Sequence, residues 1–144
     1  DNWASRGLGD VYKRQDKAHE FKKLVNESIG IIISLAEHNG SYTSAFKNIY
    51  DWISVIETTV WSNKPLILLS TSDGQNAGKT VLQTALSRFS RQSKQEIPHF
   101  SLPNFNENFS DTDGIINKKL SEELDKQISI FSNQVDNLLY SSNN

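Results

Sequence analysis

The side chains with the most chemical capability gather in two short polar turns of the chain. Each turn follows an apolar run and combines carboxylate, amide, hydroxyl or imidazole groups with glycine. Such groups can hydrogen-bond a small ligand, and glycine lets backbone N–H groups approach it closely. The candidate ligand-binding residues are Glu37, His38, Asn39, Gly40 and Ser41 in the first turn and Ser72, Asp73, Gly74 and Gln75 in the second.

Composition excludes several kinds of chemistry. The 144 residues include no cysteine, so a thiolate metal site or a cysteine nucleophile is excluded and redox work requires a cofactor. His19 and His99 have no partner at metal-ligand spacing, so we expect no metal. The net charge of -2, with basic residues scattered among acids, argues against nucleic acid. No apolar run approaches the roughly 20 residues that span a bilayer, and no signal peptide is recognisable, so a soluble, cytoplasmic protein is expected.

The spacing of apolar residues predicts helices and strands in alternation. Buried strands are predicted at 29–36, 65–71 and 96–102, the last at a sheet edge because Pro98 cannot donate to a ladder. Amphipathic helices are predicted at 16–28, from a cap at Ser41 or Thr43 to Ile53, at 81–89 and at 116–135. This order predicts a doubly wound parallel sheet, in which ligands bind beyond the carboxyl ends of the strands. Both polar turns lie at that edge.

The first fifteen residues differ from the rest of the chain. They have no helical or strand period and carry two glycines within three residues, Gly7 and Gly9. The stretch SRGLGDVYKRQ, residues 5–15, resembles a translated transposase-type sequencing adaptor. We therefore predict a foreign or disordered leader at 1–15, a domain at 16–139 and a disordered tail at 140–144.

The segment EHNGSYTSAFKNIYDW, from Glu37 to Trp52, resembles the NADPH-dependent FMN reductase family. In that family a Pro-Glu-Tyr-Asn-Gly-Ser turn leads into a helix with Lys-Asn and Asp-Trp. The resemblance extends through the LLSTS and FSLPNFNENF segments and covers about 16–135. It implies a flavodoxin-like three-layer α/β/α fold, with FMN as cofactor and NADPH or NADH as co-substrate.

The resemblance also implies how the two turns work. The first lies against the flavin ring, and the second closes on its other edge. Hydride passes from the nicotinamide to FMN and on to an acceptor such as a flavin, a quinone or an azo compound. Because the flavin carries the reacting centre, no catalytic side chain is expected. Backbone N–H groups of the Asn39-Gly40 turn, taken as the start of a helix at Ser41, would stabilise negative charge on the reduced ring. A homodimer or tetramer is expected, with Tyr50, Trp52 and Ile56 facing either a second subunit or the core.

Departures from the family pattern concern both turns. Ala36 and His38 replace the usual proline and tyrosine of the first. The second keeps Ser72, Gly74 and Gly78 of the family's Ser-Pro-Gly-Gly-x-Gly-Gly pattern but loses two of its four glycines, and Asp73 adds a negative charge beside a cofactor that becomes anionic on reduction. Gly78-Lys79-Thr80 resembles a phosphate loop, but Asp73 stands where that motif needs glycine.

Two strands that the family fold requires find no counterpart in the sequence. We therefore expect an N-terminally truncated member of the family that supplies the last three of five strands, since no serine-, arginine- and asparagine-bearing phosphate loop precedes Asp16. The strand around Ile31–Leu35 is expected to have an open edge, and this chain alone to bind FMN poorly and to be inactive. Two alternatives stay open: a non-enzymatic flavodoxin-type electron carrier, which usually has a more acidic surface, and a flavin-free relic of the fold.

Overall fold

The computed structural model describes the backbone of residues 3–142 and the side chains of residues 15–141. The chain divides into two compact units. The helical unit consists of two segments, the described residues up to Ser28 and Ser44–Ser62. It contains α1 (Trp3–Glu27) and α2 (Ser44–Ile56). The sheet unit contains residues 29–43 and the chain from Asn63 onward.

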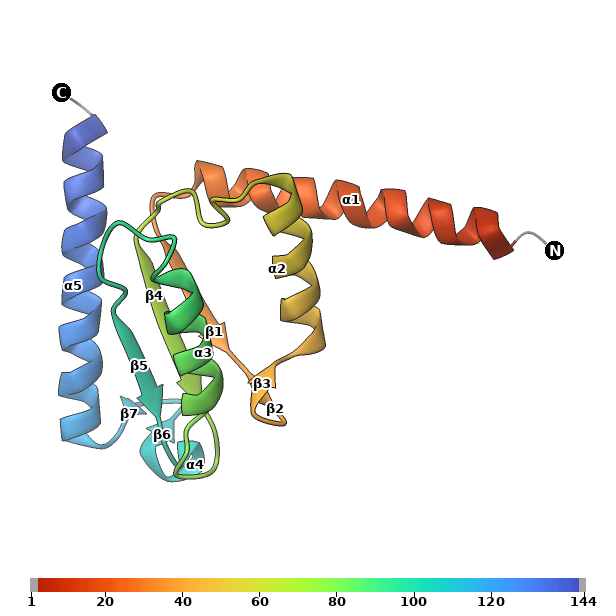
Figure 1. The fold of residues 1–144 in the computed structure, drawn as a ribbon. Coiled ribbons are helices and arrows are strands. Elements are labelled where there is room, and N and C mark those ends of the chain that lie inside the picture. The colour runs from red at the N-terminus through yellow and green to blue at the C-terminus, as the bar shows by residue number, and fades with distance from the viewer. Residues whose placement is uncertain (1–2, 143–144) are drawn as a thin grey trace. The chain divides into compact units, whose positions relative to one another are not determined.

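The sheet unit is built on three parallel strands, β1 (Ile31–Leu35), β4 (Leu66–Thr71) and β5 (His99–Leu102). Their order is β1-β4-β5. Helix α3 (Lys79–Phe89) packs against β4, and α5 (Lys118–Ser142) packs against β5 and β4 (Figure 1). The predicted α/β fold, a parallel sheet flanked by helices, is confirmed.

The burial of each strand follows its place in the sheet. In central β4, Leu66, Ile67 and Leu68 are all buried, as expected for an apolar run covered on both faces. In β1, Ile33 and Leu35 are buried while Ile32 between them is 64% exposed, so the predicted cover on both faces is wrong for this strand. Within the described residues β1 pairs only with β4, which leaves its other edge open.

The predicted edge strand β5 does lie at a sheet edge, and α5 satisfies part of its backbone. Gln127 Oε1 accepts a hydrogen bond from His99 N at 3.1 Å, and Gln134 Nε2 donates to Glu96 O at 2.8 Å. Pro98 precedes the strand, and its carbonyl accepts from Leu68 N at 3.0 Å. These side-chain bonds occupy groups that could otherwise pair with another strand.

Gly30, directly before β1, permits a close approach of α5. A Cβ at this position would lie 2.8 Å from both Phe131 Cζ and Val135 Cγ2. Carbon atoms in contact are normally about 3.5–4.0 Å apart. The absence of a side chain at Gly30 is therefore what lets Phe131 and Val135 pack here.

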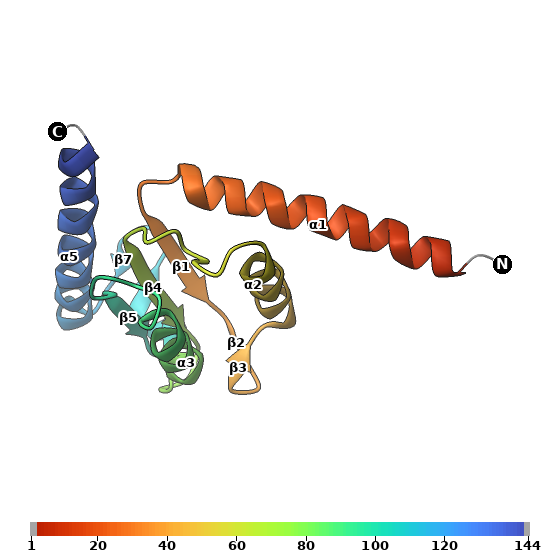
Figure 2. The same cartoon turned by 45° about the horizontal axis from the view of Figure 1, so that its top comes forward.

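Short elements follow the carboxyl ends of β1 and β5 (Figure 1). After β1 come β2 (Glu37–His38) and β3 (Ser41–Tyr42), which pair antiparallel. After β5 come α4 (Phe105–Asn108) and a ribbon of β6 (Phe109–Ser110) and β7 (Gly114–Ile115). The rings of Phe105 and Phe109 stack at 4.8 Å. Figure 2 shows the β2–β3 hairpin continuing from the end of β1.

In the helical unit, α1 packs against α2, and Lys22 fixes the loop that follows α2. Lys22 is 3% exposed, and its Nζ donates to Thr59 O, Val60 O and Ser62 Oγ, each at 2.8 Å. Glu57 Oε2 lies 3.1 Å from the same nitrogen. The buried ammonium group thus has four oxygen partners, as a buried charge requires.

Helix α1 begins at Trp3, so residues 3–15 are helical although we predicted them to lack regular structure. Once a helix is nucleated, each added residue gains a backbone hydrogen bond, and extension does not require a buried face. Gly7 and Gly9 lie within α1, where each costs about 1 kcal/mol relative to alanine. The foreign origin of this segment stays a prediction. At the other end α5 continues to Ser142, so 140–142 are helical too, while 143 and 144 lie outside the described residues.

In the part of the chain that the structure describes, no helix combines the length and apolar character needed to cross a membrane.

Candidate functional site

The first predicted turn is a tight β-hairpin. Glu37 pairs with Tyr42 and His38 with Ser41, and Asn39 and Gly40 connect them with φ of 51° and 73°. Two central residues of positive φ are the requirement of a type I′ turn, and Asn-Gly is its favoured sequence. A ligand could approach closely because no atom lies within 4 Å of the position a Gly40 Cβ would take.

The hairpin corrects the predicted start of the next helix. Helix α2 begins at Ser44, not at Ser41, which lies in β3. The Asn39-Gly40 turn is therefore separated from the helix, and the helix N-terminus does not supply the N–H donors predicted there. Thr43, the other predicted cap, stands directly before the helix.

The second predicted turn, residues 72–78, is held from one side by the segment after β5. Phe105 N donates to Ser72 O at 3.0 Å, and Asn104 N donates to Gly74 O at 3.1 Å. Asn106 Nδ2 donates to Asp73 Oδ1 at 2.9 Å, so the acidic side chain is hydrogen-bonded within the protein. These three contacts fix the first half of the turn.

The second half of the turn is anchored to the strands beneath it. Ala77 is fully buried with a φ of 58°, and its carbonyl accepts from Ser70 Oγ at 2.8 Å and Ser101 Oγ at 2.7 Å. Gly78 follows with a φ of 68°, and a Cβ there would lie 3.1 Å from Ser70 Cβ. Our sequence reading did not select Ser70 or Ser101. Their hydroxyls inside otherwise apolar strands were the available signal.

Glu37 joins the two turns. Its Oε2 accepts a hydrogen bond from Val81 N at 2.9 Å, and its Oε1 lies 3.4 Å from Asn76 Nδ2. The carboxylate of the first turn thus binds the end of the second turn and the start of α3. This role, and its partners Asn76 and Val81, were not predicted from the sequence, where Glu37 was expected to face a ligand.

The remaining predicted residues form an exposed polar surface at the carboxyl ends of β1 and β4. His38, Asn39, Gly40 and Ser41 are exposed in the hairpin, and 73–76 are exposed in the second turn. Within the described residues, the backbone N–H groups of Asp73, Gly74 and Gln75 have no hydrogen-bond acceptor. A rigid turn with free N–H donors can bind an electron-rich edge of a planar ligand without rearranging.

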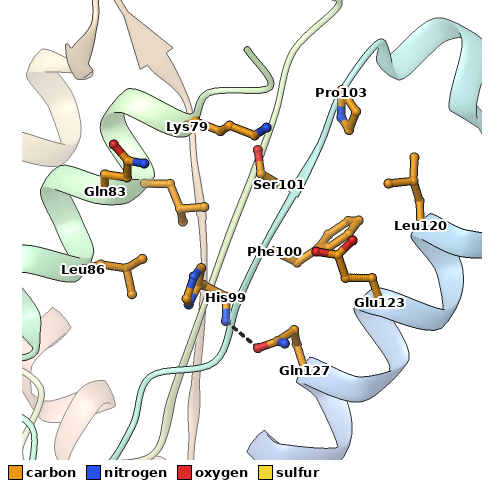
Figure 3. A pocket seen from close by; sticks show the side chains of 11 residues that line it. Lys79, Gln83, Leu86, His99, Phe100, Ser101, Pro103, Leu120, Glu123 and Gln127 are labelled. Carbon is orange, nitrogen blue, oxygen red and sulfur yellow. Dashed lines mark hydrogen bonds between the residues drawn. The ribbon is translucent and has the colours of Figure 1, made fainter. Parts of the chain in front are cut away.

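A cavity of about 360 Å³ lies elsewhere, between α3, β5 and α5 (Figure 3). Its polar lining includes Lys79, Gln83, His99, Glu123 and Gln127, and it contains none of the nine predicted binding residues. The amide oxygen of Gln127 is bound to His99 N, and the charged groups of the lining are exposed. The charged side chains that line this cavity are therefore not held in a fixed arrangement that would favour a reaction.

A metal centre is not indicated. Among the residues described by the structure, no three His, Cys, Asp or Glu side chains form a group that could hold an ion.

Comparison with known proteins identifies relatives at two levels. Residues 6–107 match the model of the NADPH-dependent FMN reductase family. The match includes both turns, begins within the segment 1–15 and ends before β6. No curated protein matches significantly.

A solved structure has the same fold. It is FerB from Paracoccus denitrificans, described as a flavoenzyme NAD(P)H:(acceptor) oxidoreductase, with a TM-score of 0.66 and 17% sequence identity. The alignment covers 85% of this chain and 69% of FerB. At this identity the likeness establishes the fold, which is flavodoxin-like.

Proposed function

The chain belongs to the NADPH-dependent FMN reductase family, and on that premise we propose that it acts as an NAD(P)H-dependent FMN reductase. In this reaction hydride passes from the nicotinamide to FMN, and the electrons pass on to a flavin, a quinone or an azo compound. The observation that carries the proposal is the pair of turns joined by Glu37 at the carboxyl ends of β1 and β4. Parallel α/β sheets bind their ligands at this edge.

The residues of the two turns fit a flavin ring. The free N–H groups of Asp73, Gly74 and Gln75 are suited to the ring's electron-rich pyrimidine edge. Gly40 leaves room for a flat ring, and the side chains of His38, Asn39 and Ser41 are exposed beside it. The carboxylate of Asp73 is held by Asn106, whose neutral amide donates a hydrogen bond to it and cancels none of its charge.

Bound FMN supplies the hydride-accepting centre, so the protein's task is to orient it and to adjust its electrostatics. The fixed geometry of 72–78, held by Ser70, Ser101 and residues 104–106, serves this task because its donors need no reorganisation.

A spectroscopic titration tests this function. We expect FMN fluorescence to be quenched on addition of the chain, with a dissociation constant of about 10 μM or weaker, corresponding to about -7 kcal/mol. Bleaching of the flavin absorbance by anaerobic NADPH, faster than in FMN solution without protein, would demonstrate the activity and would correct the expectation that this chain alone is inactive.

Two other results would replace the proposal. Bound FMN that NADPH does not bleach would favour an electron carrier. If no quenching occurs even at about millimolar concentrations of the chain, the turns no longer hold a flavin, which is the outcome for a flavin-free relic of the fold.

We propose further that the exposed face of α2 forms a homodimer contact. Trp52, Val55 and Ile56 line a cavity of about 310 Å³ with Gln15 and His19 of α1, and Val55 is 82% exposed. Tyr50, by contrast, is buried and its ring lies 6.0 Å from that of Trp61, so it belongs to the core. We propose that a second copy of the chain covers this cavity.

Light scattering after gel filtration tests the dimer. Val55→Asp is expected to weaken dimerisation at least about tenfold, because a charge would be desolvated without a partner. Asn48→Asp, an exposed change of the same charge on α2, is the control and should leave the mass unchanged. If the unaltered chain has a mass of 16.3 kDa at all concentrations, this interface does not form.

A further inference from the structure

The first turn of α3 lacks a capping side chain from its own sequence. Its N-cap residue is Gly78, and no side chain caps the helix from that position. The first backbone N–H groups of a helix have no partner within the helix and need acceptors from elsewhere. At Val81 the acceptor is Glu37, 44 positions earlier in the chain.

A local cap is excluded by geometry. Serine, threonine, aspartate or asparagine at the N-cap is the usual solution. Here residue 78 has a φ of +68°, which side-chain-bearing residues rarely adopt, and a Cβ would lie 3.1 Å from Ser70 Cβ. A capping side chain at position 78 would therefore be strained and crowded, and the acceptor has to come from another segment.

The segment that supplies the cap is the other ligand turn. Glu37 opens the β2–β3 hairpin, and β3 packs against α3. The backbone N–H of Lys79 in turn donates to Asn76 O at 2.9 Å, so the start of the helix is hydrogen-bonded to the second turn. A carboxylate is also the favoured acceptor at this end of a helix, where the dipole is positive.

We propose that Glu37 is a positioning residue for the flavin. It does not contact the ring, but fixes the second turn relative to the hairpin by capping α3 at a distance. The inference rests on the proposed function for its ligand. The coupling between the two turns is a property of the protein alone and can be measured without flavin.

Amide hydrogen exchange on the flavin-free chain measures the coupling. Glu37→Ala is expected to speed exchange at Val81 about tenfold or more, because its N–H loses its acceptor. Glu37→Gln keeps an acceptor oxygen and should retain most of the protection. Glu107→Gln, an exposed acid in the same unit, is the matched control and should change nothing. Unchanged exchange at Val81 in Glu37→Ala would overturn the proposal.

FMN titration of the same variants tests the consequence for the ligand. We expect Glu37→Ala to weaken binding about tenfold and Glu37→Gln to stay within about threefold. If Glu37→Gln keeps Val81 protected but binds FMN as poorly as Glu37→Ala, the carboxylate acts on the flavin directly and the positioning role is wrong. Equal affinity for FMN in Glu37→Ala and the unaltered chain would also overturn it.

The experiments distinguish failure of the proposed FMN reductase function from failure of the positioning role of Glu37. If the unaltered chain binds no flavin, the proposed function falls and the flavin-positioning role falls with it. Faster exchange at Val81 in Glu37→Ala would still establish the coupling of the turns in that case. If flavin binds but exchange at Val81 does not respond to Glu37→Ala, only the positioning role is lost.

Discussion

Replacing Lys22 by methionine is expected to lower the free energy of unfolding by about 3 kcal/mol. Methionine keeps most of the apolar stem but removes the ammonium group that binds Thr59 O, Val60 O and Ser62 Oγ. Lys22 is 3% exposed, so water cannot readily replace these bonds. The carbonyls of Thr59 and Val60 would be left without their donor, and the loop after α2 would keep the hydrogen bond from Ser62 Oγ to Asn26 Oδ1 as a polar contact with α1.

Urea denaturation followed by circular dichroism measures this loss. Lys23→Met is the matched control, because Lys23 is the next residue of α1, its side chain is 74% exposed, and its ion pair with Glu27 spans 3.7 Å. An exposed pair of this kind contributes less than about 1 kcal/mol. Equal urea midpoints for Lys22→Met and Lys23→Met would show that the four oxygen contacts of the Lys22 ammonium group contribute little to the free energy of unfolding beyond the packing of its apolar stem.

The strands were predictable because their signal is local. The runs ILLST and IIISL are rich in β-branched and leucine side chains, and β4 and β1 end within one residue of the predicted limits. The third strand begins three residues later than predicted. Glu96 and Pro98 lie before it, where their backbone groups bond to Gln134 and to Leu68.

The hairpin after β1 could not be read from apolar spacing. Strands of two residues contain no alternation to detect, and the polar cap signal at Ser41 suggested an earlier helix, whereas Thr43, the other predicted cap, directly precedes α2. The pair Asn39-Gly40 did carry the information, because it is the favoured sequence of a two-residue hairpin. The helical state of residues 3–15 was missed for a different reason. It depends on extension of the helix that was predicted at 16–28 and not on a local pattern of apolar residues.

At the candidate site, the sequence located the turns but not the contacts that hold them. Turn residues are marked by polarity and glycine, so both segments could be selected. The anchoring bonds join positions far apart: Glu37 to Val81, Asp73 to Asn106, and Ala77 to Ser101. Asp73 shows the consequence, since the sequence predicted a negative charge beside the cofactor but not the hydrogen bond from Asn106 that holds this carboxylate.

The second prediction with a large effect concerns Gly78. Gly78→Ala is expected to destabilise the chain by about 2 kcal/mol, the sum of left-handed backbone strain and overpacking. The added methyl would lie 3.1 Å from Ser70 Cβ, and Ser70 cannot retreat without losing its bond to Ala77 O. Because Ala77 carries the end of the turn, we expect FMN affinity to fall about tenfold as well.

Gly74→Ala separates the effect on the turn from the effect on the ligand. Gly74 has no positive φ, and its nearest neighbour is Ser72 Oγ at 4.0 Å, so we expect a change in stability below about 0.5 kcal/mol. If the ring lies against this backbone, the methyl alone should still weaken FMN binding, measured by fluorescence quenching. Unchanged affinity in Gly74→Ala together with lost affinity in Gly78→Ala would mean that the turn shapes the site from a distance, and that the donors at 73–75 do not meet the flavin.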